Sequence, residues 1–418
     1  PTPFGLVRFG VAPDHPKIQH VTRLFEKTAQ TEDFRFFGGV ALGRDITRAE
    51  LLERYDLVLY TVGTSSDNRL GIEGEDLEGS YPATTFVAWY NGHPEATGHK
   101  FDLTAERAVV IGNGNVAIDV ARMLALDPEE VQPTDTADHA VKDLAGHGVK
   151  EVVILGRRGP AQAAFTNPEL LELGELKRAD VIVDPAQLEL DPISEKWLES
   201  DSAEPTNRRN VEIMREYSQR TPEGKSHRVV LKYLRSPLEI LGDGQKVTGI
   251  RVAVNEIVDD GNGNPKAVAT GETEDIECGL VFRSIGYRGE PVDSVPFEER
   301  RGLICNEGGR VTDPQGNLLP CEYVSDWVKR GPSGVIGTNK KDSADTVAKI
   351  VEDRDAGRLP ARQSLGDNAE WLTSKVPDLV TWEGWKKIDA HEVALGEPQG
   401  RPRVKLVDID EMKQIACS

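Results

Sequence analysis

A glycine-rich turn at 112–117 has the residue types and the spacing of a nucleotide-binding turn. An apolar run, RAVVI, leads into GNGNVA, and a helix is expected to follow. In this G-x-G-x-x-A pattern Gly112 permits a tight turn, Gly114 lets the backbone approach a pyrophosphate, and the small Ala117 lets the helix pack closely on the strand. The pattern predicts a dinucleotide site, and a plain glycine-rich turn is the alternative.

Two adjacent arginines follow the next apolar run, EVVIL, at 151–155. NAD sites usually carry an acid here that binds the ribose 2′-hydroxyl. This chain instead reads GRRG, and guanidinium groups pair with phosphate oxygens. Arg157 and Arg158 therefore predict a 2′-phosphate pocket and NADP(H), with two solvated surface arginines as the alternative. A polar, acidic insertion at 127–146 accounts for the long spacing from Gly112.

A second glycine-rich turn lies near the C-terminus. After Trp327 the chain reads VKRGPSGVIG, so that the turn at 334–337 opens a predicted helix. Such a turn directs backbone N–H groups at a phosphate or at the edge of an electron-rich ring. Together with the strand ends TVG (61–63) and SIGY (284–287), it indicates a second cofactor, a flavin.

The 418 residues are 38% hydrophobic and 29% charged, a globular composition, and the length predicts two or three domains. Seventy Asp and Glu against 50 Lys and Arg give a formal net charge of −20. That charge argues against general binding of nucleic acid or anionic membranes. No apolar run approaches ~18 residues, so no membrane span is expected.

The cysteines are too far apart for the usual metal or redox motifs. They are Cys278, Cys305, Cys321 and Cys417, and no C-x-x-C occurs. A redox dithiol, a zinc ribbon and a four-cysteine iron–sulfur site therefore lack ligands at their usual spacing. We expect free thiols in a reducing cytosol and no metal site.

Alternating strand and helix patterns must position these motifs. Buried strands are expected at 56–63, 107–111, 151–155, 181–183, 229–233, 247–253 and 280–285, and helices at 17–28 and 116–126. The insertion 127–146 is expected on the surface, and 259–276 as a polar hairpin. Alternation of this kind predicts an α/β fold built on parallel sheets.

Six segments stand in the order of one known family: TPFGLVRFGVAPDHPKI, IEGEDLEGS, FVAWYNGHP, VVIGNGNVAIDVAR, ILGRRGPAQAAFTNPELLEL and WVKRGPSGVIGTNKKD. They resemble adrenodoxin-reductase-type ferredoxin–NADP+ reductases, especially the actinobacterial NADPH–ferredoxin reductases. The resemblance implies a two-domain, glutathione-reductase-like flavoprotein fold. It implies an NADP-binding domain at 104–288 and a discontinuous FAD-binding domain at 1–103 and 289–418. It also implies hydride transfer from NADPH to FAD, followed by transfer of single electrons to ferredoxin.

The resemblance also implies cofactor contacts. It places FAD against Leu6, Leu42, Trp327, Gly334, Val335 and Ile336. It places NADP(H) against Gly112, Asn113, Gly114, Asn115, Val116, Arg157, Arg158, Glu169 and Gly334. Without the resemblance, the apolar residues among these would be interpreted as ordinary core.

His15 and Glu169 resemble the polar pair that the family carries near nicotinamide and flavin. Hydride transfer needs no protein acid or base, because the cofactors supply that chemistry. Polar groups nearby can position the nicotinamide and exchange a flavin proton. By residue type alone, His15 fits a turn residue, and Glu169 fits an acid at a helix start, near the positive end of the helix dipole.

One part of the family pattern has no counterpart in this sequence. In the family, a strand–G-x-G-x-x-G–helix–strand–Glu unit that cradles FAD precedes the segment resembling TPFGLVR, and FGGVALG (37–43) is no substitute for it. We therefore expect an N-terminally truncated FAD domain with exposed apolar faces and sheet edges, and a severely reduced FAD affinity. The alternative function is that of an NADP(H)-binding fragment without flavin or activity.

A basic segment is the candidate contact for ferredoxin, which is acidic. Residues 208–235 hold eight Lys and Arg against three Glu, so the stretch Arg208–Arg235 is expected to steer an acidic partner. An incidental solvated face is the alternative. A bacterial cytoplasm is the expected compartment, although a mitochondrial matrix also fits. A subunit similar to the glutamate synthase small subunit is disfavoured, because such subunits carry cysteine-ligated iron–sulfur clusters.

Overall fold

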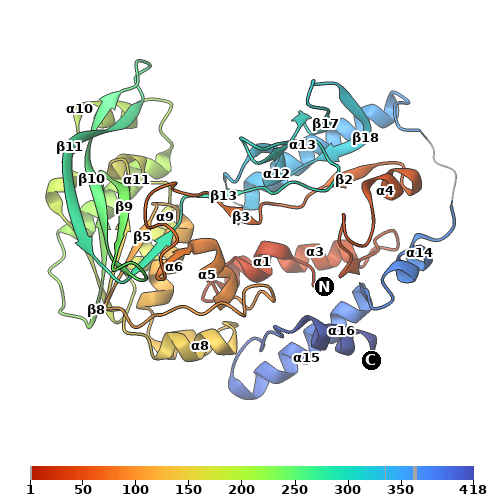
Figure 1. Ribbon diagram of the computed structural model, residues 1–418, viewed down its shortest axis with the longest axis horizontal. Coiled ribbons are helices and arrows are strands. Elements are labelled where there is room, and N and C mark those ends of the chain that lie inside the picture. The colour runs from red at the N-terminus through yellow and green to blue at the C-terminus, as the bar shows by residue number, and fades with distance from the viewer. Residues whose placement is uncertain (1, 335, 361–364) are drawn as a thin grey trace.

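The computed structural model describes residues 2–334, 336–360 and 365–418 (Figure 1). One lobe is built on a parallel sheet and the other on a smaller mixed sheet. Two strands cross between the lobes, β3 (Ser66–Asp67) and β13 (Tyr287–Arg288), and they pair antiparallel. Among the described residues, no helix is both long and apolar enough to cross a membrane.

Six parallel strands form the larger sheet, in the order β4-β12-β5-β6-β8-β7. Their bounds are β4 Ser80–Pro82, β5 Arg107–Ile111, β6 Glu151–Leu155, β7 Ala179–Val183, β8 His227–Lys232 and β12 Leu280–Arg283. The strands expected from the sequence in this region are thus present, and the parallel α/β prediction is confirmed. The carboxyl ends of β5 and β6 lie side by side, which brings the turn at 112–117 close to the arginine pair.

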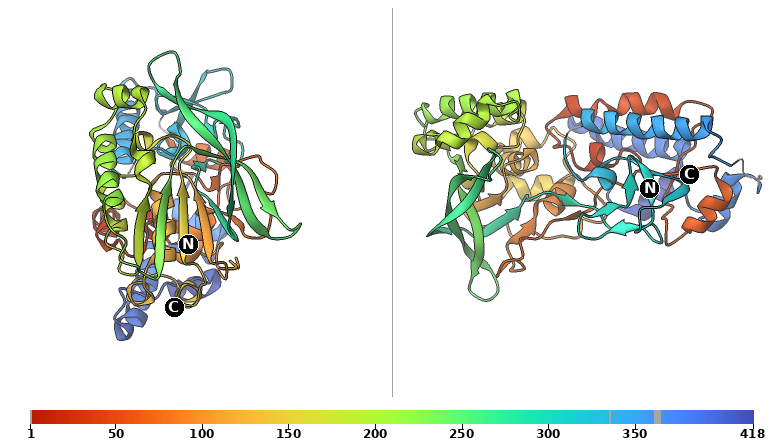
Figure 2. Two further views of the ribbon diagram at one scale, coloured as in Figure 1. Left: turned by 90° about the vertical axis from the view of Figure 1, so that its left-hand side faces the viewer. Right: turned by 90° about the horizontal axis from the view of Figure 1, so that it is seen from above.

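The two faces of this sheet carry different layers because strand residues alternate in direction. Ala108 and Val110 of β5 pack against helices, whereas Val109 and Ile111 pack against an antiparallel sheet. The helices are α5 (Ala83–Tyr90), α6 (Asn115–Ala125), α9 (Asn167–Leu173) and α11 (Pro205–Ser218). The antiparallel strands are β9 (Arg235–Gly242), β10 (Val247–Asp259) and β11 (Pro265–Glu277). Figure 2 (left) shows helices on one side and the green hairpin on the other.

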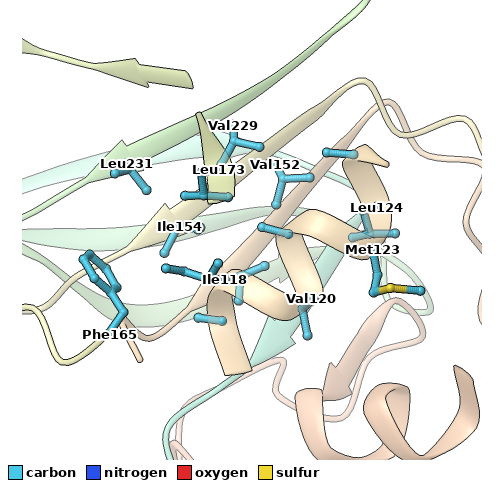
Figure 3. Close-up of a cluster of buried hydrophobic side chains, with 14 of the residues drawn as sticks. Ile118, Val120, Met123, Leu124, Val152, Ile154, Phe165, Leu173, Val229 and Leu231 are labelled. Atoms are coloured by element: carbon cyan, nitrogen blue, oxygen red, sulfur yellow. The ribbon is translucent and has the colours of Figure 1, made fainter. Parts of the chain in front are cut away.

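Apolar side chains of α6 form the centre of the helix-side core (Figure 3). Ile118 and Leu124 are fully buried, Ile118 near Ile154 of β6 and Leu124 near Val152 of the same strand. This packing fixes the start of α6 relative to the strand ends. The turn that precedes α6 therefore has a defined position.

The second lobe is a four-stranded sheet backed by a long helix. Its strand order is β16-β17-β18-β2, and β18 and β2 are parallel. The bounds are β2 Val58–Tyr60, β16 Asn306–Glu307, β17 Arg310–Thr312, β18 Leu318–Val324, α12 Trp327–Arg330 and α13 Ile336–Asp355. Strand β2 ends this sheet, and Leu59 and Val62 are 36% and 56% exposed beside it.

Helices from both ends of the chain pack beneath the second lobe. Strand β1 (Phe37–Gly38) pairs with β19 (Val380–Thr381). The helices are α1 Gly5–Phe9, α2 Pro16–Gln19, α3 Thr22–Ala29, α4 Arg48–Arg54, α14 Asn368–Lys375, α15 Trp382–Gly396 and α16 Ile409–Cys417. The single helix expected at 17–28 is therefore wrong, because the chain turns at His20 and Val21 between α2 and α3.

The insertion at 127–146 is more than a surface excursion. It forms α7 (Pro128–Val131) and α8 (Asp138–Ala145). Thr136 and Ala140 are fully buried, and Asp135 is 5% exposed. The polar composition of this insertion suggested a surface segment. Its polar residues instead contact the C-terminal part of the chain, because Arg401 donates a hydrogen bond to Asp138.

Candidate cofactor site

The glycine-rich turn follows β5 directly and has the geometry that its sequence requires. Gly112 has φ +132, and a Cβ built there would lie 2.0 Å from the backbone oxygen of Ser284, at the end of the adjacent strand β12. A side chain at this position would therefore collide with the sheet. Around Gly114, in contrast, a Cβ would meet nothing within 4 Å. The backbone is thus open on the side where a pyrophosphate would approach.

Gly114 is also the N-cap of α6, and no side chain caps this helix start. The first N–H groups of a helix lack partners within the helix and favour an anion. Val116 packs against the helix-side core. Asn113 and Asn115 have structural bonds, because Asn113 accepts from Ala164 N at 2.9 Å and Asn115 Oδ1 accepts from Thr166 N at 2.8 Å.

Arg157 and Arg158 are exposed at the end of β6 and have no acidic partner among the described residues. Their backbone oxygens accept bonds from Asn255 and from Leu234. Burial, followed by the neighbouring Arg157, lowers the pKa of the Arg158 guanidinium. Two like charges held together without a counterion attract an anion.

His15 lies in a buried ionic cluster where α2 meets α6 and α9. Its Nδ1 is 3.8 Å from Glu169 Oε1, so the structure brings together the two residues that the sequence paired. A second acid is nearer, because Nε2 of His15 is 2.6 Å from Oε2 of Glu172. Glu169 is the more buried of the two, with a side chain 11% exposed against 34% for Glu172.

Arg122, near the end of α6, connects the members of this cluster. Its NH1 lies 2.8 Å from Glu172 and contacts His15, while its NH2 contacts Asp14. His15, Glu169 and Glu172 have ligand atoms close enough together for a metal ion. The guanidinium of Arg122 already lies beside these ligand atoms and supplies positive charge there.

The cluster holds more carboxyl groups than cations. Asp119 is 8% exposed, and its Oδ1 is 4.0 Å from Arg122 and has no hydrogen-bond partner among the described residues. Burial, and then the charge of Glu169, raises the pKa of Asp119 well above its usual value. Burial likewise raises the pKa of Glu169. Burial thus favours the protonated form of Asp119 and Glu169.

The residues assigned to a flavin lie on the second lobe and on α1. Trp327 begins α12, packs 5.3 Å from the ring of Tyr287, and has a buried Nε1 with no partner among the described residues. Gly334 has φ +81, and a Cβ there would lie 2.4 Å from Thr338 Oγ1. Leu6 on α1 is 43% exposed and Leu42 is partly buried. Ile336 begins α13, and Val335 lies outside the described residues.

Sequence reasoning missed Glu172, Arg122 and Asp119. A signal for Glu172 was present, because it follows Glu169 by three residues and three-residue spacing places both on one helix face. Asp119 and Arg122 have the same spacing along α6. Arg122 contacts His15, which lies more than a hundred residues away in the sequence. No local sequence pattern reveals such a contact.

The parallel sheet, the glycine turn at its carboxyl edge and the uncapped helix start define a Rossmann-type dinucleotide-binding protein. No protein-family model matches the chain. It is 50% identical to NADPH-ferredoxin reductase FprA of Mycobacterium leprae over 99% of this chain and 90% of that protein. It is 42% identical to the mitochondrial NADPH:adrenodoxin oxidoreductase of Salvelinus fontinalis, over 100% of this chain and 84% of that one.

A solved structure agrees with these relatives. The structure of Mycobacterium tuberculosis FprA in complex with NADPH superposes with a TM-score of 0.93 at 48% identity, over 100% of this chain and 91% of that one. The chain therefore belongs to the adrenodoxin-reductase-type family of NADPH–ferredoxin reductases. The resemblance seen in the sequence is confirmed at the level of the family. The predicted truncation of the FAD domain stays a prediction.

The arginine pair provides the first test. Replacing Arg157 and Arg158 by Ala should reduce the preference for NADPH over NADH by at least about 100-fold, because each charge-assisted bond to the 2′-phosphate contributes about 1.5–3 kcal/mol. Arg251→Ala is the control, since Arg251 is already paired with Asp275 at 2.8 Å. Binding of both nucleotides is measured by titration. An unchanged preference would remove the arginines from the site.

A second prediction concerns Asp119. Its folded-state pKa is raised, so its contribution to stability is fully present below the unfolded pKa and declines as the pH rises toward the folded value. The free energy of unfolding of Asp119→Asn should equal that of the native chain near pH 4. At pH 8 it should be higher than that of the native chain by roughly 1–3 kcal/mol. Urea unfolding between pH 4 and pH 8 measures this difference in free energy. Asp143→Asn, on an exposed face of α8, is the control. A pH-independent difference would contradict the assignment.

Proposed function

We propose that this chain is an NADPH–ferredoxin reductase that uses FAD. The observation that carries the proposal is the unpaired arginine pair beside an uncapped helix start, within a chain 50% identical to a protein named for that activity. The turn presents open backbone to which a pyrophosphate could bind. The arginines present two guanidinium groups, without a counterion among the described residues, to which a 2′-phosphate could bind. We assign Gly112 to Val116, Arg157 and Arg158 to NADP(H).

The residues on the second lobe fit a flavin. Trp327 has a buried indole N–H without a partner among the described residues, and Gly334 occupies a position where a Cβ would collide with Thr338. We assign Leu6, Leu42, Trp327, Gly334 and Ile336 to FAD, together with Val335, and Gly334 also to NADP(H). When bound, FAD would take a hydride from NADPH and release electrons singly to a one-electron acceptor.

The ionic cluster positions nicotinamide and holds protons. His15 lies between Glu169 and Glu172, and Glu169 has a raised pKa because it is buried. A protonated carboxyl can donate a hydrogen bond that an ionised carboxylate cannot. We propose that Glu169 orients the nicotinamide. In this proposal Glu172 and Arg122 orient His15, which exchanges a proton with solvent.

The division of the chain follows the two lobes except at β4 and α5, which pack on the parallel-sheet lobe. We propose an NADP-binding domain at 104–288 and a FAD-binding domain at 1–103 and 289–418, with β4 joining the parallel sheet from the N-terminal side. All four cysteines are free thiols. We propose a bacterial cytoplasm as the compartment.

Reduction of a ferredoxin tests the function directly. The purified chain, supplied with FAD, should oxidise NADPH and reduce a plant-type [2Fe–2S] ferredoxin and ferricyanide, both followed by absorbance. A second candidate is an NADP(H)-binding protein without flavin, which the open edge of β2 and the exposed Val62 favour. NADP+ binding without retained flavin or electron transfer would establish that candidate and contradict the proposal.

The docking of ferredoxin is proposed at the basic stretch Arg208–Arg235, and within it on α11 and the residues that follow. Arg228 pairs with Glu151, and Lys232 and Arg235 share Glu274, so these three charges are already neutralised. Arg208, Arg209, Arg215 and Arg220 are exposed. Of these, Arg209 pairs with the exposed Glu212 and Glu216 of the same helix. Figure 2 (right) shows α11 along the same side of the molecule as the red α3 and the blue α13.

Charge reversal tests this docking site. Arg209→Glu combined with Arg220→Glu should raise KM for an acidic ferredoxin about tenfold at low salt and weaken the dependence of the rate on ionic strength. Ferricyanide reduction should not change, because it requires no docking. Lys266→Glu on the exposed hairpin strand β11 is the control. Unchanged ferredoxin kinetics would place docking elsewhere.

A further inference from the structure

Lys405 is a buried cation that no step above uses. Its side chain is 1% exposed, and its Nζ lies 3.0 Å from Asp135 Oδ2. The same ammonium donates to the backbone oxygen of Arg8 at 3.0 Å and to Asn91 Oδ1 at 3.3 Å. Burial lowers the pKa of Lys405, and the carboxylate of Asp135 opposes that shift. An ammonium removed so completely from water needs this many acceptors to remain charged.

Asp135 binds a second segment at the same time. Its other oxygen, Oδ1, accepts from Gln19 Nε2 at 3.4 Å. Arg8 and Gln19 lie on either side of His15 in the sequence. The single ion pair of Lys405 and Asp135 therefore holds both ends of residues 8–19, the segment that carries His15.

Neighbouring contacts fix the C-terminal segment 401–406 that carries Lys405. Arg401 donates to Thr134 O at 3.0 Å and to Asp138 Oδ1 at 2.5 Å, both in the insertion of the parallel-sheet lobe. Glu392 of α15 is 0% exposed and accepts from the backbone N of Leu406 at 2.8 Å and from Arg8 NH1 at 2.9 Å. Segment 401–406 thus joins α1, α15 and the insertion.

We propose that Lys405 is a positioning residue for the reductase reaction: paired with Asp135, it holds residues 8–19 so that His15 stays against Glu169 and Glu172. The inference rests on the proposed function for its kinetic part only. His15 is held from the other side by its contact with Arg122, which leaves the segment 8–19 fixed between two ionic anchors. A displacement of about 1 Å at such a group can lower a rate about 100-fold.

The test is Lys405→Met in the FAD-loaded chain with NADPH. Methionine nearly preserves the volume but removes the ammonium, so the carbonyl of Arg8 and the carboxylate of Asp135 lose their bonds to Lys405. Backbone hydrogen exchange should accelerate within 8–19, and kcat for ferricyanide should fall at least about tenfold. The Kd for NADP+ should change less than twofold, because the turn at 112–117 and the arginine pair are untouched.

A double variant separates positioning from stability. Lys405→Met with Asp135→Leu removes both charges, so no lone charge is left buried and the melting temperature should recover relative to the single variant. The bonds from Lys405 to Arg8 O and from Gln19 to Asp135 stay absent, although Arg8 keeps its pair with Glu392. Therefore kcat should stay low and exchange fast. Recovery of kcat and exchange together with the melting temperature would overturn the proposal and reduce Lys405 to a structural role.

A control and an independent readout complete the design. Lys413 pairs with Asp378 at 2.6 Å on the exposed side of α16, and Lys413→Met should leave exchange within 8–19 and kcat unchanged. Hydrogen exchange is measured without turnover. Absence of ferredoxin reduction in the native chain would overturn the proposed function alone, whereas unaltered exchange within 8–19 in Lys405→Met would overturn the positioning role alone.

Discussion

The guanidinium of Arg122 is the interaction on which the functional region depends. It contacts Asp14 and His15 of the N-terminal segment and Glu172 of α9, and it lies 4.0 Å from Asp119 of its own helix. Removing such a group would leave several carboxyl groups buried without a counterion, which is far more costly than losing one surface ion pair. Its partners come from three separate segments, so this one guanidinium group fixes the position of these segments relative to one another.

The parallel sheet supplies the other half of this arrangement. Its strands direct alternate side chains to a helical layer and to an antiparallel layer. A one-residue slip of β5 would move Val110 and Ile111 into the opposite layers, where they do not fit. The carboxyl ends of β5 and β6 consequently hold the turn at 112–117 and Arg157 in register. A cofactor that contacts both the turn and Arg157 therefore meets groups already in position, and the protein loses little conformational entropy on binding it.

Local patterns predicted much of this fold from sequence. The strands 107–111 and 151–155 were predicted with their observed bounds, because a short apolar run before glycine has few alternatives in an α/β chain. The break between α2 and α3 was missed because Ile18, Val21 and Leu24 keep helical spacing through a turn. His15 and Glu169, which the family resemblance paired, lie 3.8 Å apart, whereas the closer Glu172 was overlooked. Contacts such as Lys405 with Asp135 join positions far apart in the chain, and only the folded structure reveals them.

The distribution of free and paired cations separates function from architecture. By count the stretch 208–235 is strongly basic, yet Arg228, Lys232 and Arg235 have carboxylate partners within the fold. Arg157 and Arg158 have none among the described residues, and they stand where a phosphate would bind. The adjacent guanidinium groups of Arg157 and Arg158 repel each other, and an anion bound between them would relieve that repulsion. Unpaired cations held at a fixed edge of a sheet are therefore better evidence for a binding site than the local density of basic residues.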